Sequence, residues 1–462
     1  MLKPARLGLG GVVAALAWIA ARAGGLDPDI AATIAVTALT ATWWITEAMP
    51  IPAASLTPLA LFPLVGVLDQ RQAASALGSY VIVLLMASFM LSKSLERSGL
   101  HERLAVGMIR LTGSSGRSLV FGFMVAAAVL SMWISNTATT LMLSTMALSI
   151  IARGSGDLEL DDADRLAAPL LMGIAFAASL GGVGTLIGTP PNLIFLDAYQ
   201  KATGEEYAFL DWMAVGVPVV AVGVPIMALW LTRGLGGVAA PELPTPGAWR
   251  TDEKRVMVVF GVAILAWVTR TGPFGGWSAL FDIGLAGDST VAVAAVVVMF
   301  LVPNGRGGAL LDWETANDIP WGMLLLFAGG ICIATAFRES GLSTLIGEAL
   351  ARLIGGEPFL TILAMCLAVT FLTEITSNTA TANLLMPVLA AVATSEGLPP
   401  ALLMAPAAIA CSCAFMLPVA TAPNAIIYAT GRVPIARMAR EGVVLNVMIA
   451  VATAVITSQL LR

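Results

Sequence analysis

Three short motifs occur twice in this chain, in the same order. They are LERSGL at 95–100 with FRESGL at 337–342, SNTA at 135–138 with SNTA at 377–380, and GTPPN at 188–192 with ATAPN at 420–424. The first two pairs are 242 residues apart and the third pair is 232 residues apart. Such nearly constant spacing indicates a duplication, so the fold must be built from two related halves.

Long apolar runs separate the motifs. Of the 462 residues, 58% are hydrophobic and only 11% are charged, whereas a soluble protein of this length would carry about a quarter charged residues. With roughly 20 apolar residues needed per crossing, the sequence predicts an all-α polytopic membrane protein. The expected spans lie near 7–24, 30–46, 51–68, 76–95, 167–196, 212–232, 256–270, 288–302, 319–337, 401–430 and 442–461.

Each SNTA motif interrupts a pair of apolar runs that are marginal for a hydrocarbon core of about 30 Å. We therefore interpret residues 118–152 and 358–394 as re-entrant hairpins, which leaves eleven transmembrane helices. The positive-inside rule supports this count, because a cytoplasmic N-terminus places 17 of the 24 lysines and arginines in the cytoplasm. The first apolar run resembles a signal peptide at Ala21-Arg22-Ala23, but we expect it to be a retained span.

Five spans separate equivalent points of the two halves, so the second half should be inverted relative to the first. The expected parts are a first transmembrane helix at 1–28, a first repeat at 29–235, a cytoplasmic linker at 236–253 and a second repeat at 254–462. The first repeat holds a broken helix at 167–196 and the second holds one at 401–430. Inverted repeats with broken helices are typical of secondary transporters, whose substrate site lies at the midplane. We expect the two hairpin tips to converge there.

The residue types at the tips and breaks are ones that can bind ions. Hydroxyl, amide and carbonyl oxygens suit a small hard cation, while backbone N–H groups at a helix start suit an anion. Neither tip and neither break contains a lysine or an arginine. An anionic substrate would therefore be neutralised by co-bound cations and helix dipoles, which predicts cation coupling.

Two carboxylates occur in apolar surroundings, Glu47 and Glu374. Each is a candidate for a functional role such as a proton relay, or for a structural role as a hydrogen-bond acceptor.

Other chemistries are disfavoured. The four cysteines lie in apolar stretches, the single histidine is His101, and the sequence holds no GxxxxGK[ST] loop and no basic run of the kind that binds nucleic acid. We expect neither an enzyme nor a metal cluster.

Several motifs together resemble the divalent anion/sodium symporter family, which includes sodium-coupled dicarboxylate and citrate transporters. They are WWITEAMPIP at 43–52, the two SNTAT motifs, IGTPPN and ATAPNAI. The resemblance covers essentially the whole chain. It implies a homodimer in which each protomer has a scaffold domain and a transport domain that moves like an elevator.

The resemblance also implies binding residues. The first sodium site would use Ser131, Ser135, Asn136 and a carbonyl near Gly184 or Gly188, and the second would use Thr373, Asn378 and carbonyls near Thr376 and Ala420. The dicarboxylate would contact Asn136, Thr137, Asn378 and Thr379, with Thr189, Pro190 and Thr421 close by. The family often has two prolines after the threonine, whereas Ala422 follows Thr421 here, and this difference bears on substrate choice.

We therefore expect a sodium-coupled symporter of C4-dicarboxylates such as succinate, fumarate or malate. Short loops and the absence of an N-x-[ST] sequence favour the inner membrane of a bacterium. A dicarboxylate exchanger, a sodium-coupled citrate or sulfate carrier, and an anion channel remain as alternatives.

Overall fold

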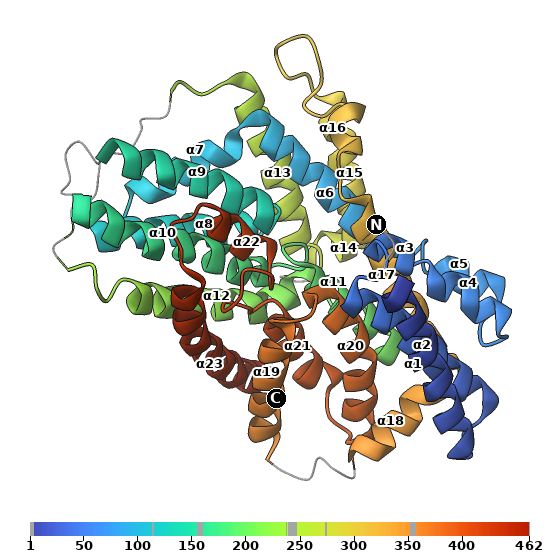
Figure 1. Ribbon diagram of the computed structural model, residues 1–462. Coiled ribbons are helices and arrows are strands. Elements are labelled where there is room, and N and C mark those ends of the chain that lie inside the picture. The colour runs from blue at the N-terminus through green and yellow to red at the C-terminus, as the bar shows by residue number, and fades with distance from the viewer. Residues whose placement is uncertain are drawn as a thin grey trace.

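The computed structural model describes residues 4–112, 115–154, 160–236, 238, 247–272, 275–351 and 357–461. Throughout these ranges the chain is built from helices, and its extended pairing is one isolated bridge between Pro303 and Ala309 (Figure 1). Half of the linker expected at 236–253 lies outside the described residues, and α13 already begins at Thr251.

The first half contains two helix pairs that matter for the site. The helices are α1 (Pro4–Ala23), α2 (Pro28–Thr46), α3 (Ile51–Ala54), α4 (Thr57–Leu64), α5 (Gln70–Ser75), α6 (Tyr80–Ser98), α7 (Leu100–Arg110), α8 (Gly116–Ser131), α9 (Asn136–Gly154), α10 (Leu160–Gly181), the 3₁₀ turn η1 (Gly182–Gly184), α11 (Pro190–Thr203) and α12 (Phe209–Leu231). The α8–α9 pair is the expected first hairpin, and the α10–α11 pair is the expected first broken helix.

The second half repeats this arrangement. Its helices are α13 (Thr251–Val268), α14 (Gly276–Leu280), α15 (Asp288–Leu301), α16 (Trp313–Asn317), α17 (Trp321–Glu339), α18 (Leu342–Ala351), α19 (Pro358–Thr373), α20 (Asn378–Ser395), α21 (Pro400–Cys411), α22 (Ala422–Ala429) and α23 (Ile435–Leu460). The α19–α20 pair corresponds to α8–α9, and the α21–α22 pair corresponds to α10–α11.

The structure differs from expectation at 51–68, where two short helices replace one continuous span. Prolines 50, 52, 58 and 63 fall in or beside this segment. Proline donates no backbone N–H and its ring crowds the preceding turn, so a straight helix is disfavoured here. The chain bends at Ser55, whose hydroxyl accepts a hydrogen bond from the indole of Trp44 (3.0 Å).

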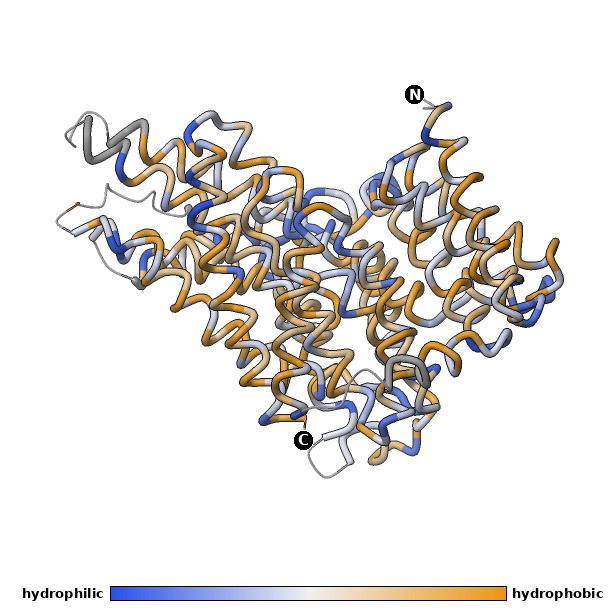
Figure 2. Tube along the Cα trace, turned by 60° about the horizontal axis from the view of Figure 1, so that its bottom comes forward, coloured by the Kyte–Doolittle hydropathy of each residue, from blue (hydrophilic) through white to orange (hydrophobic). Residues whose placement is uncertain are grey.

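Seven of the described helices are long and apolar enough to cross a membrane, and six further apolar helices are shorter. Large apolar side chains are exposed along α1, α13 and α15, including Leu16, Val262 and Val297. Exposed apolar faces of this kind are satisfied by lipid, and hydrophilic residues gather toward loops and helix ends (Figure 2). The protein is a multi-pass membrane protein.

The two halves interlock around α10, whose residues are buried without interruption from Leu166 through the 3₁₀ turn to Leu186. The helix that follows each break contacts the hairpin of the other half. Helix α11 contacts α20 and α21, while α22 contacts α9 and α10 (Figure 1). Each broken helix is therefore placed beside the SNTA motif of the opposite half.

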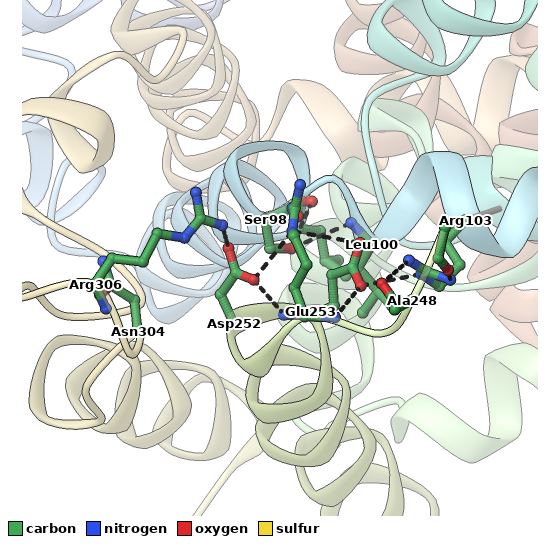
Figure 3. Close-up of polar contacts among 11 residues, drawn as sticks. Ser98, Leu100, Arg103, Ala248, Asp252, Glu253, Asn304 and Arg306 are labelled. Atoms are coloured by element: carbon green, nitrogen blue, oxygen red, sulfur yellow. Dashed lines mark hydrogen bonds and ion pairs between the residues drawn. The ribbon is translucent and has the colours of Figure 1, made fainter.

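An ionic cluster ties the junction between α6 and α7 to the start of α13 (Figure 3). Glu253 is 4% exposed and accepts hydrogen bonds from Arg103 (3.0 Å) and from the backbone N–H of Arg250 (2.8 Å). The guanidinium of Arg103 also donates to the carbonyls of Gly247 (2.8 Å) and Ala248 (2.9 Å). These bonds fix α7, the helix that leads into the first hairpin.

Candidate functional site

Each hairpin tip is closed by the same side-chain contact. We name residues 131–137 the first turn and residues 373–379 the second turn. In the first turn the hydroxyl of Ser131 donates to Oδ1 of Asn136, and in the second the hydroxyl of Thr373 donates to Oδ1 of Asn378 (2.6 Å). Both asparagines begin a helix, α9 and α20. The tips thus hold amide oxygens beside helix N-termini, and at α20 the Ser377 hydroxyl caps the N–H of Ala380 (3.4 Å).

In each broken helix, the asparagine of the PN motif forms hydrogen bonds that hold the break in place. We name residues 182–189 the first break and residues 412–421 the second break. The side-chain amide donates to two backbone carbonyls of the break in each case. These pairs are Asn192 with Gly182 (3.1 Å) and Thr185 (2.7 Å), and Asn424 with Ala414 and Leu417 (both 3.0 Å). The asparagine amides thereby donate hydrogen bonds to backbone carbonyls that have lost their α-helical partners.

The first turn and first break converge on Gly182. A methyl group placed there would lie 2.8 Å from the Gly188 carbonyl oxygen and 2.9 Å from Oδ1 of Asn136. Because Ser131 bonds that same Oδ1, three neutral oxygens meet in a place that only glycine leaves open. This donor set fits a small hard cation. Gly184 instead lies against the side chain of Met132.

The second turn and second break meet through Thr373, whose hydroxyl also approaches the Cys411 carbonyl (3.1 Å). The hydroxyl of Thr376 bonds Thr381 (2.7 Å), so only the backbone of Thr376 remains for an ion. Ala420 lies at the end of the break, where its N–H donates to the Leu417 carbonyl (3.2 Å).

The expected anion contacts lie at the starts of four helices. Thr189 precedes α11 and its hydroxyl approaches that of Ser412 in the second break (3.4 Å), which joins the two halves directly. Thr421 caps α22 by accepting from the backbone N–H of Asn424 (3.2 Å). Thr137 is exposed and Thr379 is 6% exposed. Within the described ranges no hydrogen bond connects the first turn with the second.

The two candidate carboxylates differ sharply. Glu47 is exposed at the C-terminal end of α2, where it adopts the left-handed conformation (φ 47°), although its sequence neighbours are apolar. Glu374 is 3% exposed and accepts hydrogen bonds from three backbone N–H groups and one side-chain amide. Glu374 therefore has the structural contacts of an acceptor at the second break.

A cavity of about 470 Å³ lies away from both turns, between α11, α17, α18 and α20. Lys201 and Arg338 line it, and Lys201 pairs with Asp197 (2.9 Å) and bonds the Ile331 carbonyl on α17 (3.2 Å). This cavity marks incomplete packing between α17 and the helices that carry the site.

Sequence reasoning missed the roles of Gly182, Ser412, Asn446 and the two PN asparagines. Asn192 and Asn424 share the 232-residue offset of their motifs, so the repeat itself carried a signal for both. Asn446 and Ser412 carried no such signal, because their partners come from distant segments.

Comparison with known proteins defines the class of this architecture. The crystal structure of the Alcanivorax borkumensis YdaH transporter superposes with a TM-score of 0.61 at 16% identity, covering 92% of this chain and 98% of that one. The Neisseria gonorrhoeae MtrF structure gives a TM-score of 0.50 at 13% identity, with 86% and 83% covered. The chain therefore shares its fold with these two structures.

The sequence comparisons identify the family. The citrate transporter family matches residues 41–405 and 345–461. The sodium-dependent dicarboxylate transporter SdcS of Staphylococcus saprophyticus is 38% identical over 433 residues, which cover 90% of this chain and 83% of that protein. Its Staphylococcus aureus counterpart is 38% identical over 437 residues. The chain belongs to the citrate transporter family, a family of transporters rather than enzymes, and is a homologue of the sodium-dependent dicarboxylate transporters.

Proposed function

We propose that this protein is a sodium-coupled symporter that carries C4-dicarboxylates such as succinate, fumarate or malate across the inner membrane of a bacterium. One observation carries the proposal: two turns closed by the same hydroxyl-to-asparagine contact, each beside a helix break, offer hydroxyl and amide oxygens and helix N-termini without a lysine or arginine. The names of the SdcS relatives support the choice of sodium and dicarboxylate.

The cations would occupy the junctions of turn and break. Ser131, Ser135, Asn136 and the Gly188 carbonyl would hold the first sodium ion. Gly184 contributes through the backbone of the same break. The second ion would lie against the side chains of Thr373 and Asn378 and the carbonyls of Thr376 and Ala420. Oxygen ligands of this kind replace the hydration shell of a hard cation.

The dicarboxylate would bind where the helices start. Asn136, Thr137, Asn378 and Thr379 offer amide, hydroxyl and backbone N–H donors, and Thr189, Pro190 and Thr421 form the adjoining wall. Two sodium ions would offset the two carboxylate charges, so the anion should bind weakly until the ions are present. Electrostatic attraction through a medium of low dielectric constant makes this dependence steep.

The transport cycle follows from the inverted arrangement. Eleven spans, a cytoplasmic N-terminus and two re-entrant hairpins would let the hairpins and broken helices move as one body against a scaffold within a homodimer. The 470 Å³ cavity between α17 and the helices α11 and α20 supports a sliding boundary there. The cluster around Glu253 would fix α7 at the edge of the moving body.

Uptake of radiolabelled succinate into proteoliposomes tests the proposal. Accumulation should need an inward sodium gradient and should be lost when potassium replaces sodium. Equal uptake with either cation would refute sodium coupling. Preloading the vesicles with unlabelled succinate separates symport from exchange, since an exchanger would accumulate label only in preloaded vesicles.

Citrate is the second candidate substrate. The family is described as citrate transporters, and Ala422 replaces a proline ring beside Thr421, which leaves more room at the wall of the site. Competition of succinate uptake by citrate, fumarate, malate and sulfate, each at one sodium concentration, ranks these anions directly.

A further inference from the structure

Glu374 is held by an unusually complete set of donors. Its Oε1 accepts from the backbone N–H groups of Phe415 (2.7 Å) and Met416 (2.9 Å) and from Nδ2 of Asn446 (2.7 Å). Its Oε2 accepts from the N–H of Leu417 (3.0 Å). Three consecutive N–H groups of the second break therefore point at one buried carboxylate, which fixes the path of the break.

The charge of this carboxylate is not cancelled by a cation. All four donors are neutral, and no ion pair among the described residues includes Glu374. Both oxygens of Glu374 act only as hydrogen-bond acceptors, which is the bonding pattern of a carboxylate without a proton. The second turn thus has a fixed negative charge directly after Thr373, the residue that bonds Asn378.

The first half has no such charge. The residue 242 positions before Glu374 is Met132, and its side chain packs against Gly184. Neutral groups hold the first break instead. The hydroxyl of Thr185 donates to the Met132 carbonyl (2.5 Å), and the indole of Trp212 donates to the Val183 carbonyl (2.8 Å). The two halves match in their turns but differ in charge.

We propose that Glu374 is a positioning residue whose charge makes the two cation sites unequal, so that the site at Thr373 and Asn378 is the tighter one and fills first. This inference rests on the proposed function. In protein of effective dielectric constant about 20, a unit charge about 12 Å away changes cation affinity on the order of tenfold, and a nearer charge changes it more. Binding of the first cation then neutralises Glu374, and the dicarboxylate requires further cations.

Thermal stability of the purified protein in detergent tests this without transport or substrate. Sodium chloride replaces choline chloride at constant ionic strength, and the midpoint of the stabilisation gives the sodium affinity. In Glu374→Gln the midpoint should rise about tenfold. The matched control is Asn446→Leu, which removes a donor to Glu374 and an acceptor of the Phe415 N–H in the same break but leaves the charge. Its midpoint should stay within about threefold of wild type.

Two results would overturn the inference. One is a sodium midpoint in Glu374→Gln equal to that of the wild type. The other is an equal shift of the midpoint in Glu374→Gln and Asn446→Leu, which would mean that the carboxylate only stabilises the conformation of the break. A wild-type protein that sodium does not stabilise beyond choline would instead refute sodium coupling itself. The two failures are therefore distinguishable.

A second pair of variants keeps the test valid if Glu374→Gln does not fold. Ser131→Ala and Thr373→Val remove equivalent hydroxyls from the first and second turns. Ser131→Ala should keep the stabilisation seen at low sodium concentration, and Thr373→Val should lose it. Equal midpoints for the two variants, or loss in Ser131→Ala alone, would overturn the proposed order of filling.

Discussion

Replacing Gly182 by alanine should disable the first cation site while leaving the fold largely intact. The added methyl group would lie 2.8 Å from the Gly188 carbonyl oxygen and 2.9 Å from Oδ1 of Asn136. Ordinary contacts at a Cβ start near 3.4 Å, so both oxygens must retreat by about half an ångström. The Gly188 carbonyl has little freedom to do so, because Gly188 itself is packed against Gly182. A Cβ added to Gly188 would lie only 2.4 Å from the Gly182 carbonyl oxygen.

We expect a modest loss of folding stability and a large loss of sodium affinity. Overpacking of this kind costs about 1–3 kcal/mol, and the reduced freedom of the unfolded chain returns about 0.4–1 kcal/mol. The net loss is therefore about 1–2 kcal/mol. Two ligands of one cation are displaced together, however, so sodium affinity and sodium-driven uptake should fall by at least about tenfold.

Gly261→Ala on α13 is the matched control, because nothing lies within 4 Å of a methyl group at that position. In a helix interior this change should be neutral or stabilising by about 0.5–1 kcal/mol. Thermal unfolding across a sodium titration and succinate uptake would be measured for both variants. Wild-type sodium dependence in Gly182→Ala would refute the convergence of Asn136 and the Gly188 carbonyl on an ion.

Four other substitutions give three further predictions. Asn136→Ala and Asn378→Ala should each reduce succinate uptake by about a hundredfold or more while the purified protein still elutes as a folded species, because each loses an oxygen and a donor of the site; near-normal uptake by both would contradict the site assignment. Asn424→Ala should lower stability by about 2–3 kcal/mol in thermal unfolding, since it leaves two buried carbonyls without their donor; an unchanged melting curve would show that the second break does not need the amide. Asp288→Ala should destabilise by about 3–5 kcal/mol, because Asp288 (1% exposed) pairs with the buried guanidinium of Arg270 at 2.7 Å; a loss below about 1 kcal/mol would mean that Arg270 finds solvent instead.

The repeat motifs located the elements of the candidate site. Their spacing marked both turns and both breaks, whereas proline alone would not have done so, because Pro218, Pro225 and Pro387 lie inside continuous helices. The division of 51–68 into two short helices was not predicted. The apolar composition of this segment indicates that it lies in the membrane, but it does not show where the helix is interrupted unless the prolines are also considered. The exposure of Glu47 was not predicted for a related reason: its sequence neighbours are apolar, yet it ends α2 and is exposed.

Contacts between distant segments lie beyond what the sequence could indicate. The donors to Glu374 come from residues 415–417 and from Asn446, 41 to 72 positions away. The approach of Thr189 to Ser412 spans 223 positions and depends on how the two halves interlock. The sequence shows which residues are polar, but only the packed fold determines which polar groups form hydrogen bonds with one another.

The most direct measurement is an experimental structure determined in sodium chloride and succinate. Our account predicts anion density at the helix starts, in contact with Asn136, Thr137, Asn378 and Thr379, with a cation beside each turn. Anion density in the cavity lined by Lys201 and Arg338 instead, with both turns empty, would contradict it.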